Sequence, residues 1–185
     1  GKTLGTFQIA EIIGKGGMGV VYRANDRALN RTVALKVLSQ ELRDQTFLQR
    51  FVREARIAAK LDHPHIVHVY TIASADAGLA GTRVWYIAMQ YVEGKTIASY
   101  LQGNHRFSSR KALLVARYVA DALRVAHEAG IIHRDIKPNN IMIDRQGKVK
   151  VMDFGLARAV VRSASVTQTG TYLGTPTYSS PEQCE

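Results

Sequence analysis

An eight-residue segment, 133–140, constrains this chain more than any other part of its sequence. It reads His-Arg-Asp-Ile-Lys-Pro-Asn-Asn and therefore gathers a histidine, two cations, a carboxylate and two amides in one loop. Asp153-Phe154-Gly155 follows, with Asp153 thirteen residues after Asn140 and a short apolar hairpin between them. A carboxylate can take a proton from a hydroxyl, and the oxygens of Asn and Asp are ligands that Mg²⁺ prefers. The two segments together indicate a polar reaction site rather than a loop of the core.

A glycine-rich turn at 14–19 is the second signal. Its sequence, Gly-Lys-Gly-Gly-Met-Gly, fits the pattern G-x-G-x-x-G, and glycines let backbone N–H groups approach phosphates because no Cβ intervenes. The flanking segments 7–13 and 20–24 both read as strands, whereas a dinucleotide-binding turn would lead into a helix. The order of strand, glycine loop and strand favours a loop that covers nucleotide phosphates. An ordinary hairpin turn is the alternative.

Lys36 and Glu54 form a third signal, because both charges fall among apolar residues. Segment 32–38 reads as a strand with Lys36 between apolar neighbours, and segment 44–61 reads as a helix. Glu54 occupies the apolar stripe of that helix, which is otherwise formed by Phe47, Phe51, Ala58 and Leu61. A buried carboxylate without a partner is costly, so Lys36 is its expected partner. The alternative puts Glu54 at the edge of the stripe, with Lys36 extending to water.

The remaining pattern separates a β-rich part from a helical part. Further strands are expected at 66–73 and 84–91, a short linker at 93–95, helices at 96–101 and 109–129, and a hairpin over 141–152. The apolar stripe of the longer helix is expected at Leu113, Ala116, Ala120, Leu123 and His127. The sequence therefore predicts a mostly antiparallel sheet with one helix over 1–92, followed by a helical part from 94.

Composition restricts the class of protein without choosing a function. With 185 residues, 46% hydrophobic and 22% charged, the chain suits a globular protein of about one domain and excludes a coiled coil or a collagen repeat. Its net charge of +10 favours anionic partners such as nucleotides, nucleic acids or acidic lipids. A lone cysteine, Cys184, excludes an internal disulfide and fits a reduced, intracellular setting. No apolar run is long enough for a membrane helix, so no membrane segment is expected.

Jointly, these motifs make the chain resemble a eukaryotic-type (Hanks-type) protein kinase over nearly its whole length. The motifs occur in the family's order, namely 14–21, Val33-Ala34-Leu35-Lys36, Glu54, 133–140, Asp153-Phe154-Gly155 and Ser180-Pro181-Glu182. The Lys-Pro-x-Asn form of the loop and the segment 174–178 resemble the serine/threonine branch. The Gly-Gly-Met-Gly turn and the Pro-Glu-Gln ending resemble bacterial members of the PknB type.

The resemblance implies an α+β, two-lobe fold. The N-lobe is expected to be complete over 1–92, with a hinge at 88–93. The helical C-lobe is expected over 94–185, with a catalytic loop at 131–140 and an activation segment at 153–182. The helices that normally follow Glu182 are missing, so the C-lobe is expected to be truncated and the chain to be a fragment.

The resemblance also implies roles for individual residues. Asp135 would be the catalytic base, Lys137 would neutralise the transferring phosphoryl group, and Thr175 would help to admit a Ser or Thr substrate. Asn140 and Asp153 would hold Mg²⁺, with Mn²⁺ as an alternative ion. The residues expected to contact ATP are Ile13, Gly14, Lys15, Gly16, Gly17, Met18, Gly19, Val20, Val21, Ala34, Lys36, Met89, Gln90, Val92 and Met142, with Glu54 fixing Lys36.

Control by phosphorylation is implied by Arg134, which precedes the catalytic Asp as it does in kinases switched through the activation loop. Thr167 and Thr169 best match the autophosphorylation sites of bacterial members. A phosphate there would add about −1.5 to −2 charge, which Arg134 and its neighbours could pair. The alternative is an ordinary flexible polar loop.

The implied activity is transfer of the γ-phosphate of Mg-ATP to Ser and Thr hydroxyls of protein substrates. The resemblance allows a kinase-domain dimer for autophosphorylation and a cytoplasmic kinase domain, with membrane anchoring of a longer protein left open. The alternatives are an ATP-binding scaffold (a pseudokinase), a small-molecule phosphotransferase, nucleic-acid binding, and a fragment without activity. The complete set of catalytic residues argues against the scaffold. Dispersed basic residues argue against nucleic acid as a partner.

Overall fold

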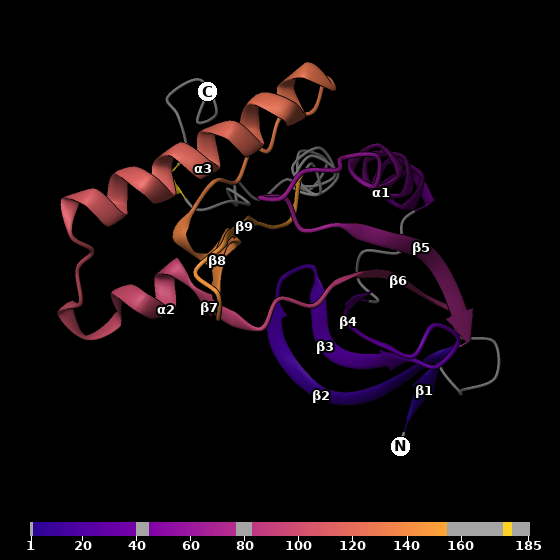
Figure 1. Ribbon diagram of the computed structural model, residues 1–185. Helices are drawn as coiled ribbons and strands as arrows, with labels where there is room; N and C mark the ends of the chain where they lie inside the picture. The colour runs from indigo at the N-terminus through magenta and orange to yellow at the C-terminus, as the bar shows by residue number, and fades with distance from the viewer. Residues whose placement is uncertain (1, 40–44, 77–82, 155–175, 179–185) are drawn as a thin grey trace. The chain divides into compact units, whose positions relative to one another are not determined.

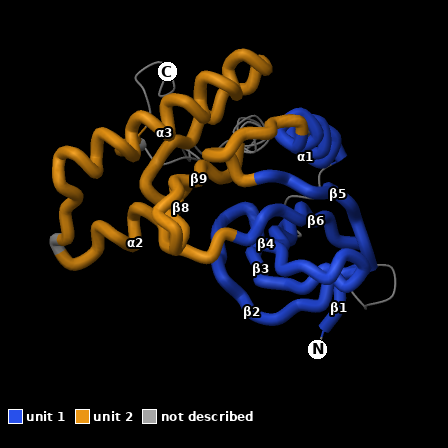
Figure 2. The backbone as a smooth tube through the Cα atoms, in the orientation of Figure 1, with its two compact units in different colours: residues 1–59, 68–91 blue, residues 60–67, 92–185 orange. Residues whose placement is uncertain are grey.

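The computed structural model describes residues 2–39, 45–76, 83–154 and 176–178 (Figure 1). Figure 2 shows that the chain forms two compact units. Unit 1 comprises Gly1–Ala59 and His68–Tyr91, and unit 2 comprises Lys60–Val67 and Val92–Glu185. The chain thus passes into unit 2 twice, once directly after its first helix and again after Tyr91.

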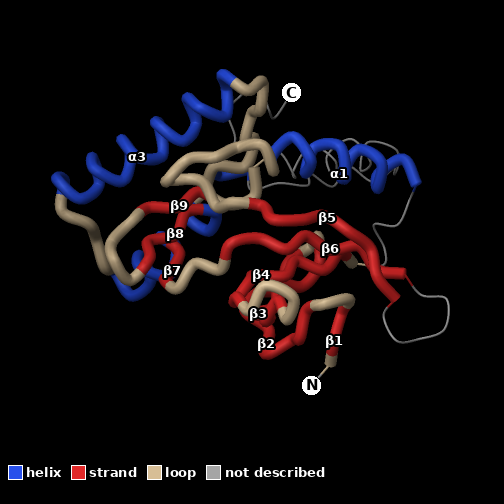
Figure 3. Tube along the Cα trace, turned by 45° about the vertical axis from the view of Figure 1, so that its right-hand side comes forward, coloured by secondary structure: helices blue, strands red, loops and turns tan. Residues whose placement is uncertain are grey.

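Unit 1 is built on a six-stranded antiparallel sheet, which confirms the sheet predicted for this part of the chain (Figure 3). The strand order is β1 (Thr3–Leu4), β2 (Phe7–Gly16), β3 (Gly19–Asp26), β4 (Arg31–Leu38), β6 (Arg83–Gln90) and β5 (Val69–Asp76). Strand β5 begins later than the predicted residue 66, because Ile66 pairs with Val151 of unit 2 instead.

Strand β4 lies inside this sheet, between β3 and β6. Val33 and Leu35 on one of its faces are fully buried in a cluster with Phe7, Tyr86 and Ala88. The opposite face is buried as well, since Ala34, Lys36 and Leu38 are all less than a tenth exposed. A strand covered on both faces explains why its sequence is an almost continuous apolar run, in which Lys36 stands out.

Helix α1 (Gln45–Ala58) completes unit 1 and contacts β5 (Figure 3). Its buried residues, Phe51, Ala55 and Ala58, follow the helical spacing. The helix ends at Ala58, before the predicted residue 61.

Unit 2 contains a three-stranded sheet of β7 (Gly94–Thr96), β8 (Ile141–Asp144) and β9 (Val149–Val151). The predicted linker at 93–95 is wrong, because Gly94 and its neighbours pair with β8 as strand β7. A Cβ on Gly94 would lie 2.1 Å from the carbonyl oxygen of Ile143, so only glycine permits this close approach.

Two helices of unit 2 begin at capping side chains. Thr96 caps α2 (Ile97–Leu101), and Ser108 caps α3 (Ser109–Glu128), which contacts β9. The predicted apolar stripe of α3 is wrong, since Leu113 is 71% exposed. The buried stripe is instead Val115, Val119, Ala122 and Ala126. Both stripes have helical spacing, so spacing alone does not indicate which one is buried.

Short 3-10 turns occur at Gln102–Asn104, Pro138–Asn140 and Pro176–Tyr178. None of the helices within the described ranges is both long enough and apolar enough to cross a membrane.

Candidate active site

The loop at 131–140 links the end of α3 to strand β8 in unit 2. Gly130, with a φ of +73°, turns the chain out of the helix, and the 3-10 turn Pro138–Asn140 carries it into β8. Of the three described non-glycine residues with positive φ, one is Asn30, just before β4, and the other two are Arg134 and Asp153, with values of 66° and 59°. Such backbone strain gathers at functional sites, and here it falls on two residues that the sequence singles out.

Asp135, Lys137 and Asn140 meet within this loop. The Nζ of Lys137 lies 2.9 Å from Oδ2 of Asp135. The side-chain nitrogen of Asn140 donates one hydrogen bond to the same Oδ2, at 2.9 Å, and another to the backbone oxygen of Asp135, at 2.8 Å. Two donors therefore fix the orientation of the Asp135 carboxylate. These three predicted site residues are brought together.

His133 joins this loop to the segment that carries Asp153. Its side chain is 1% exposed, and Nε2 donates to the backbone oxygen of Met152 at 2.7 Å. Nδ1 accepts from the backbone N–H of Asp135 at 3.3 Å, so the proton is on Nε2 and the ring is neutral. Burial lowers the pKa of His133 from its ordinary value, although the Met152 carbonyl and nearby carboxylates act in the opposite direction. The ring also contacts Phe154, with a centroid distance of 4.7 Å.

This joining role of His133 is a feature that sequence reasoning missed. The sequence places a histidine two residues before Asp135 but does not indicate that its ring is buried between two segments. A buried histidine that uses both nitrogens is recognisable only when its partners, Met152 and Asp135, are located in space.

Asn140 and Asp153 are the candidate ligands for a divalent cation. The N–H of Met152 donates to the backbone oxygen of Asn140 at 2.9 Å, which holds the chain just before Asp153 beside Asn140. Because the Asn140 amide nitrogen faces two oxygens of Asp135, the ligand atom that Asn140 can offer is Oδ1. Among the described residues, no three His, Cys, Asp or Glu side chains form a group that could hold a metal ion. One carboxylate and one amide fit Mg²⁺, which keeps several waters and takes its other oxygens from phosphates.

The glycine-rich loop of unit 1 closes the hairpin of β2 and β3. Gly16 pairs with Gly19, and a Cβ built on Gly16 or Gly17 would meet no atom within 4 Å. Gly19, with a φ of +141°, is different, because a Cβ there would lie 2.0 Å from the carbonyl oxygen of Val37. The backbone around Gly16 and Gly17 is therefore open to a ligand, whereas Gly19 is required by the fold.

Other predicted ATP-contacting residues of unit 1 are neighbours in the sheet. Val21 lies opposite Lys36, and Ala34 lies opposite Met89. Lys36 is 7% exposed, and Glu54 is half-buried on α1. The ion pair between Lys36 and Glu54 stays a prediction. The remaining predicted contacts lie on β2 and β3 (Ile13, Gly14, Lys15 and Val20), in the turn between those strands (Met18), at the end of β6 (Gln90), and in unit 2 (Val92 and Met142).

Several predicted site residues lie outside the described residues. They are Gly155, Thr167, Thr169, Thr175 and the motif Ser180-Pro181-Glu182.

Comparison with known proteins gives one consistent result. The family model described as protein kinase domain matches residues 7–185. The serine/threonine-protein kinase PrkC of Bacillus subtilis is 43% identical over 180 residues, which cover 97% of this chain and 27% of PrkC. The serine/threonine-protein kinase PknB of Mycobacterium tuberculosis is 47% identical over 179 residues, covering 96% of this chain and 28% of PknB. The chain thus spans about a quarter of the length of the curated relatives that it matches.

Proposed function

The chain belongs to the protein kinase family, and from this premise we propose that it transfers the γ-phosphoryl group of Mg-ATP to serine and threonine hydroxyls of proteins. The observation that carries the proposal is the fixed carboxylate of Asp135, held by Lys137 and Asn140. The names of the relatives, which are serine/threonine-protein kinases, support the substrate class.

Asp135 acts as the general base in this proposal. Its carboxylate accepts the proton of the substrate hydroxyl while the hydroxyl oxygen bonds to the γ-phosphorus. The bond between that phosphorus and the oxygen that bridges to the β-phosphate breaks, and ADP leaves with the bond's electron pair. Lys137, at 2.9 Å from Asp135, brings a positive charge to the phosphoryl group as it moves.

Asn140 and Asp153 are the residues that would hold Mg²⁺, or Mn²⁺ in its place. The metal ion, when bound, would neutralise charge on the phosphate oxygens. The protein would contribute by holding the two ligands beside each other. The contacts that support this are the hydrogen bonds of Met152, whose backbone oxygen accepts from His133 and whose N–H donates to the backbone oxygen of Asn140. Thr175 would contact Asp135 and Lys137, as the sequence resemblance implies.

The residues of unit 1 would bind the nucleotide. The open backbone at Gly16 and Gly17 would cover the phosphates, and Lys36, paired with Glu54, would bind the α- and β-phosphates. Val21, Ala34 and Met89 lie close in the sheet and would face the adenine. Positioning and charge stabilisation of this kind would supply most of the rate enhancement.

The proposal also includes control of the activity by phosphorylation and the compartment in which the kinase domain acts. Phosphates on Thr167 or Thr169 would pair with Arg134, and a kinase-domain dimer would allow one copy to phosphorylate another. The kinase domain would act in the cytoplasm.

Phosphate transfer itself tests the proposal. Purified protein is mixed with Mg-ATP carrying a labelled γ-phosphate and with a protein rich in Ser and Thr, and the labelled amino acids are identified. Label on serine or threonine supports the proposal. Binding of ATP without any transfer would favour an ATP-binding scaffold instead.

A further inference from the structure

The segment Lys60–Val67 is joined to strand β9 by an isolated parallel bridge and by backbone hydrogen bonds. The N–H of Val67 donates to the backbone oxygen of Val151 at 2.9 Å. The N–H of Val151 donates in turn to the backbone oxygen of His65 at 2.8 Å, and Ile66 bridges to Val151. The residues that follow α1 in sequence therefore share backbone hydrogen bonds with the strand that leads to Asp153.

Side chains add to this attachment at His65. Its Nδ1 lies 2.8 Å from the backbone oxygen of Val149, so the ring nitrogen donates to β9. The ring also stacks on Tyr118 of α3, with centroids 4.2 Å apart and an interplanar angle of 26°. Lys150 contributes a further hydrogen bond from its Nζ to the backbone oxygen of Ile66, at 3.4 Å.

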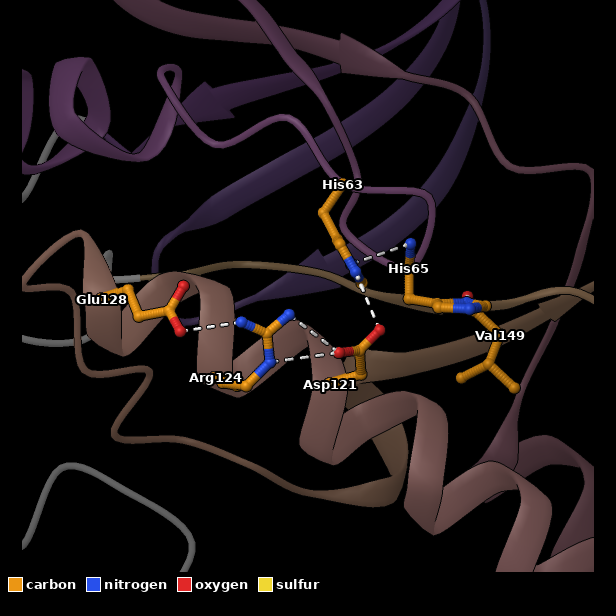
Figure 4. A network of polar contacts seen from close by, with 6 residues as sticks. All are labelled: His63, His65, Asp121, Arg124, Glu128 and Val149. Carbon is orange, nitrogen blue, oxygen red and sulfur yellow. Dashed lines mark hydrogen bonds and ion pairs between the residues drawn. The ribbon is translucent and has the colours of Figure 1, made fainter.

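His63 adds a polar contact between this segment and α3 (Figure 4). Its Nε2 lies 3.1 Å from Oδ2 of Asp121, and its Nδ1 accepts from the N–H of His65 at 3.3 Å. The ring nitrogen that faces Asp121 is therefore the one that bears the proton. With a side-chain exposure of 11%, His63 is largely buried, so loss of either partner would leave a polar nitrogen poorly solvated.

Asp121 is itself held in place by Arg124. Two guanidinium nitrogens of Arg124 lie 3.1 and 3.3 Å from Oδ1, while Oδ2 accepts from His63. The hydrogen bond from Arg124 holds the pKa of Asp121 below its ordinary value; His63 acts in the same direction, and desolvation acts against both. The carboxylate is thus ionised near neutral pH and oriented toward His63. Arg124 also pairs with Glu128 at 2.7 Å, on the exposed side of the helix.

We propose that His63 and Asp121 form a clamp that positions strand β9, and through it Asp153, for phosphate transfer. The clamp is defined as the His63–Asp121 hydrogen bond together with the backbone bonds that it secures between segment 60–67 and β9. The strand continues into Met152, whose backbone oxygen and nitrogen bind His133 and Asn140. Displacement of β9 would therefore move Met152 and Asp153. The effect on phosphate transfer rests on the proposed function, whereas the clamp itself does not.

A metal site is the other use that two histidines and an aspartate could have. The described residues offer no three-ligand group of that kind, and both nitrogens of His63 are already engaged. His63 and Asp121 are therefore positioning residues, which act on the reaction through β9.

Amide hydrogen exchange tests the clamp without any need for activity. In His63→Ala and in Asp121→Ala, the amides of Val67 and Val151 should exchange about tenfold faster, the size expected for loss of one hydrogen bond. The double variant should exchange no faster than either single variant, because both substitutions remove the same contact. Arg110→Gln, at an exposed position in the first turn of α3, is the matched control and should leave both amides unchanged. Unchanged exchange in the single variants, or additive effects in the double variant, would overturn the clamp.

His63→Gln separates positioning from a general loss of packing. A glutamine amide can donate to Asp121 much as Nε2 does, so this variant should restore slow exchange. With phosphate transfer as the second readout, His63→Ala should lower kcat about tenfold and leave the KM for the protein substrate unchanged, and His63→Gln should recover kcat. Faster exchange with unchanged kcat would overturn the link to transfer. If the unmodified protein transfers nothing, the proposed function fails while the exchange data still decide the clamp.

Discussion

Lys137 and Asn140 both bind the same oxygen of Asp135. Lys137 Nζ and Asn140 Nδ2 each lie 2.9 Å from Oδ2, on side chains that are largely withdrawn from solvent. Charge-assisted hydrogen bonds of this kind fix direction as well as adding energy. In the proposed reaction, Oδ1 is therefore the oxygen that accepts the substrate proton, because Oδ2 already has two donors.

Asp135→Asn should remove the proton acceptor and keep the shape of the side chain. We expect the rate of phosphate transfer to fall by about 10²–10⁴-fold, the usual contribution of a general base. ATP affinity, measured by calorimetry, should stay close to that of the unmodified protein, because the proposed nucleotide contacts are made by other residues.

Asp76→Asn is the matched control for this change. Asp76 is an exposed residue at the end of β5 in unit 1, and the same substitution there should leave transfer unchanged. Near-normal turnover in Asp135→Asn would contradict the role of Asp135.

Asn140→Ala should destabilise the loop, because it removes two hydrogen bonds to Asp135. Asn140 is 8% exposed, so its partners would not be fully solvated after its loss. The free energy of unfolding, measured in urea, should drop by about 1–3 kcal/mol. Asn139→Ala changes an exposed neighbour and should have no comparable effect. Equal losses in the two variants would mean that Asn140 does not hold the loop.

Substitution by alanine should affect stability very differently at two glycines of the same loop. Gly19→Ala would bring a Cβ to 2.0 Å from Val37 O at a φ of +141°, so we expect a loss of about 3 kcal/mol or a failure to fold. Gly17→Ala meets nothing within 4 Å and should change stability by less than about 1 kcal/mol. Urea unfolding of both variants checks the contrast, and similar losses would refute it.

His133 should make the protein less stable as the pH falls below neutral. Its folded pKa is lowered by burial, so the unfolded chain takes up the proton first as the pH falls past the usual 6.5. This contribution to stability is present above 6.5 and is lost toward the lower, folded pKa. His133→Gln keeps a donor for Met152 and cannot titrate.

The free energy of unfolding should therefore fall more in the unmodified protein than in His133→Gln between about pH 7 and about pH 5. Parallel pH profiles for the two proteins would show that His133 does not titrate as inferred.

Activation by phosphorylation gives a further prediction. If Thr167 and Thr169 accept the activating phosphates, the double substitution Thr167→Ala/Thr169→Ala should leave a poorly active enzyme. In the unmodified protein, mass spectrometry of residues 163–175 should find phosphate on Thr167 or Thr169. Full activity in the double variant would argue against the switch.

Local patterns were sufficient to predict the sheet of unit 1 and most of the helices. Alternating and continuous apolar runs give β2, β3, β4 and β6 close to their observed bounds, and a serine and a glycine bracket α3. The strands predicted on both sides of the glycine-rich turn are confirmed as β2 and β3, although β2 extends to Gly16 and β3 begins at Gly19.

Features that depend on distant partners could not be predicted in this way. Gly94 looks like a linker residue, and only the approach of Ile143 makes it part of a strand. The predicted stripe that contains Leu113 and the buried stripe that contains Val115 both have helical spacing. Packing against the rest of unit 2 decides which stripe is buried. His63 and Asp121 lie 58 residues apart, so nothing local to either one indicates their contact.

The central claim is that this chain transfers phosphate and uses Asp135 to do so. The most direct measurement follows labelled γ-phosphate from Mg-ATP into protein, with identification of the labelled amino acids, for the unmodified protein and for Asp135→Asn. We predict label on serine and threonine in the first and label reduced by at least about 10²-fold in the second, with ATP bound by both. Bound ATP without transfer in the unmodified protein, or equal transfer in both proteins, would contradict the account.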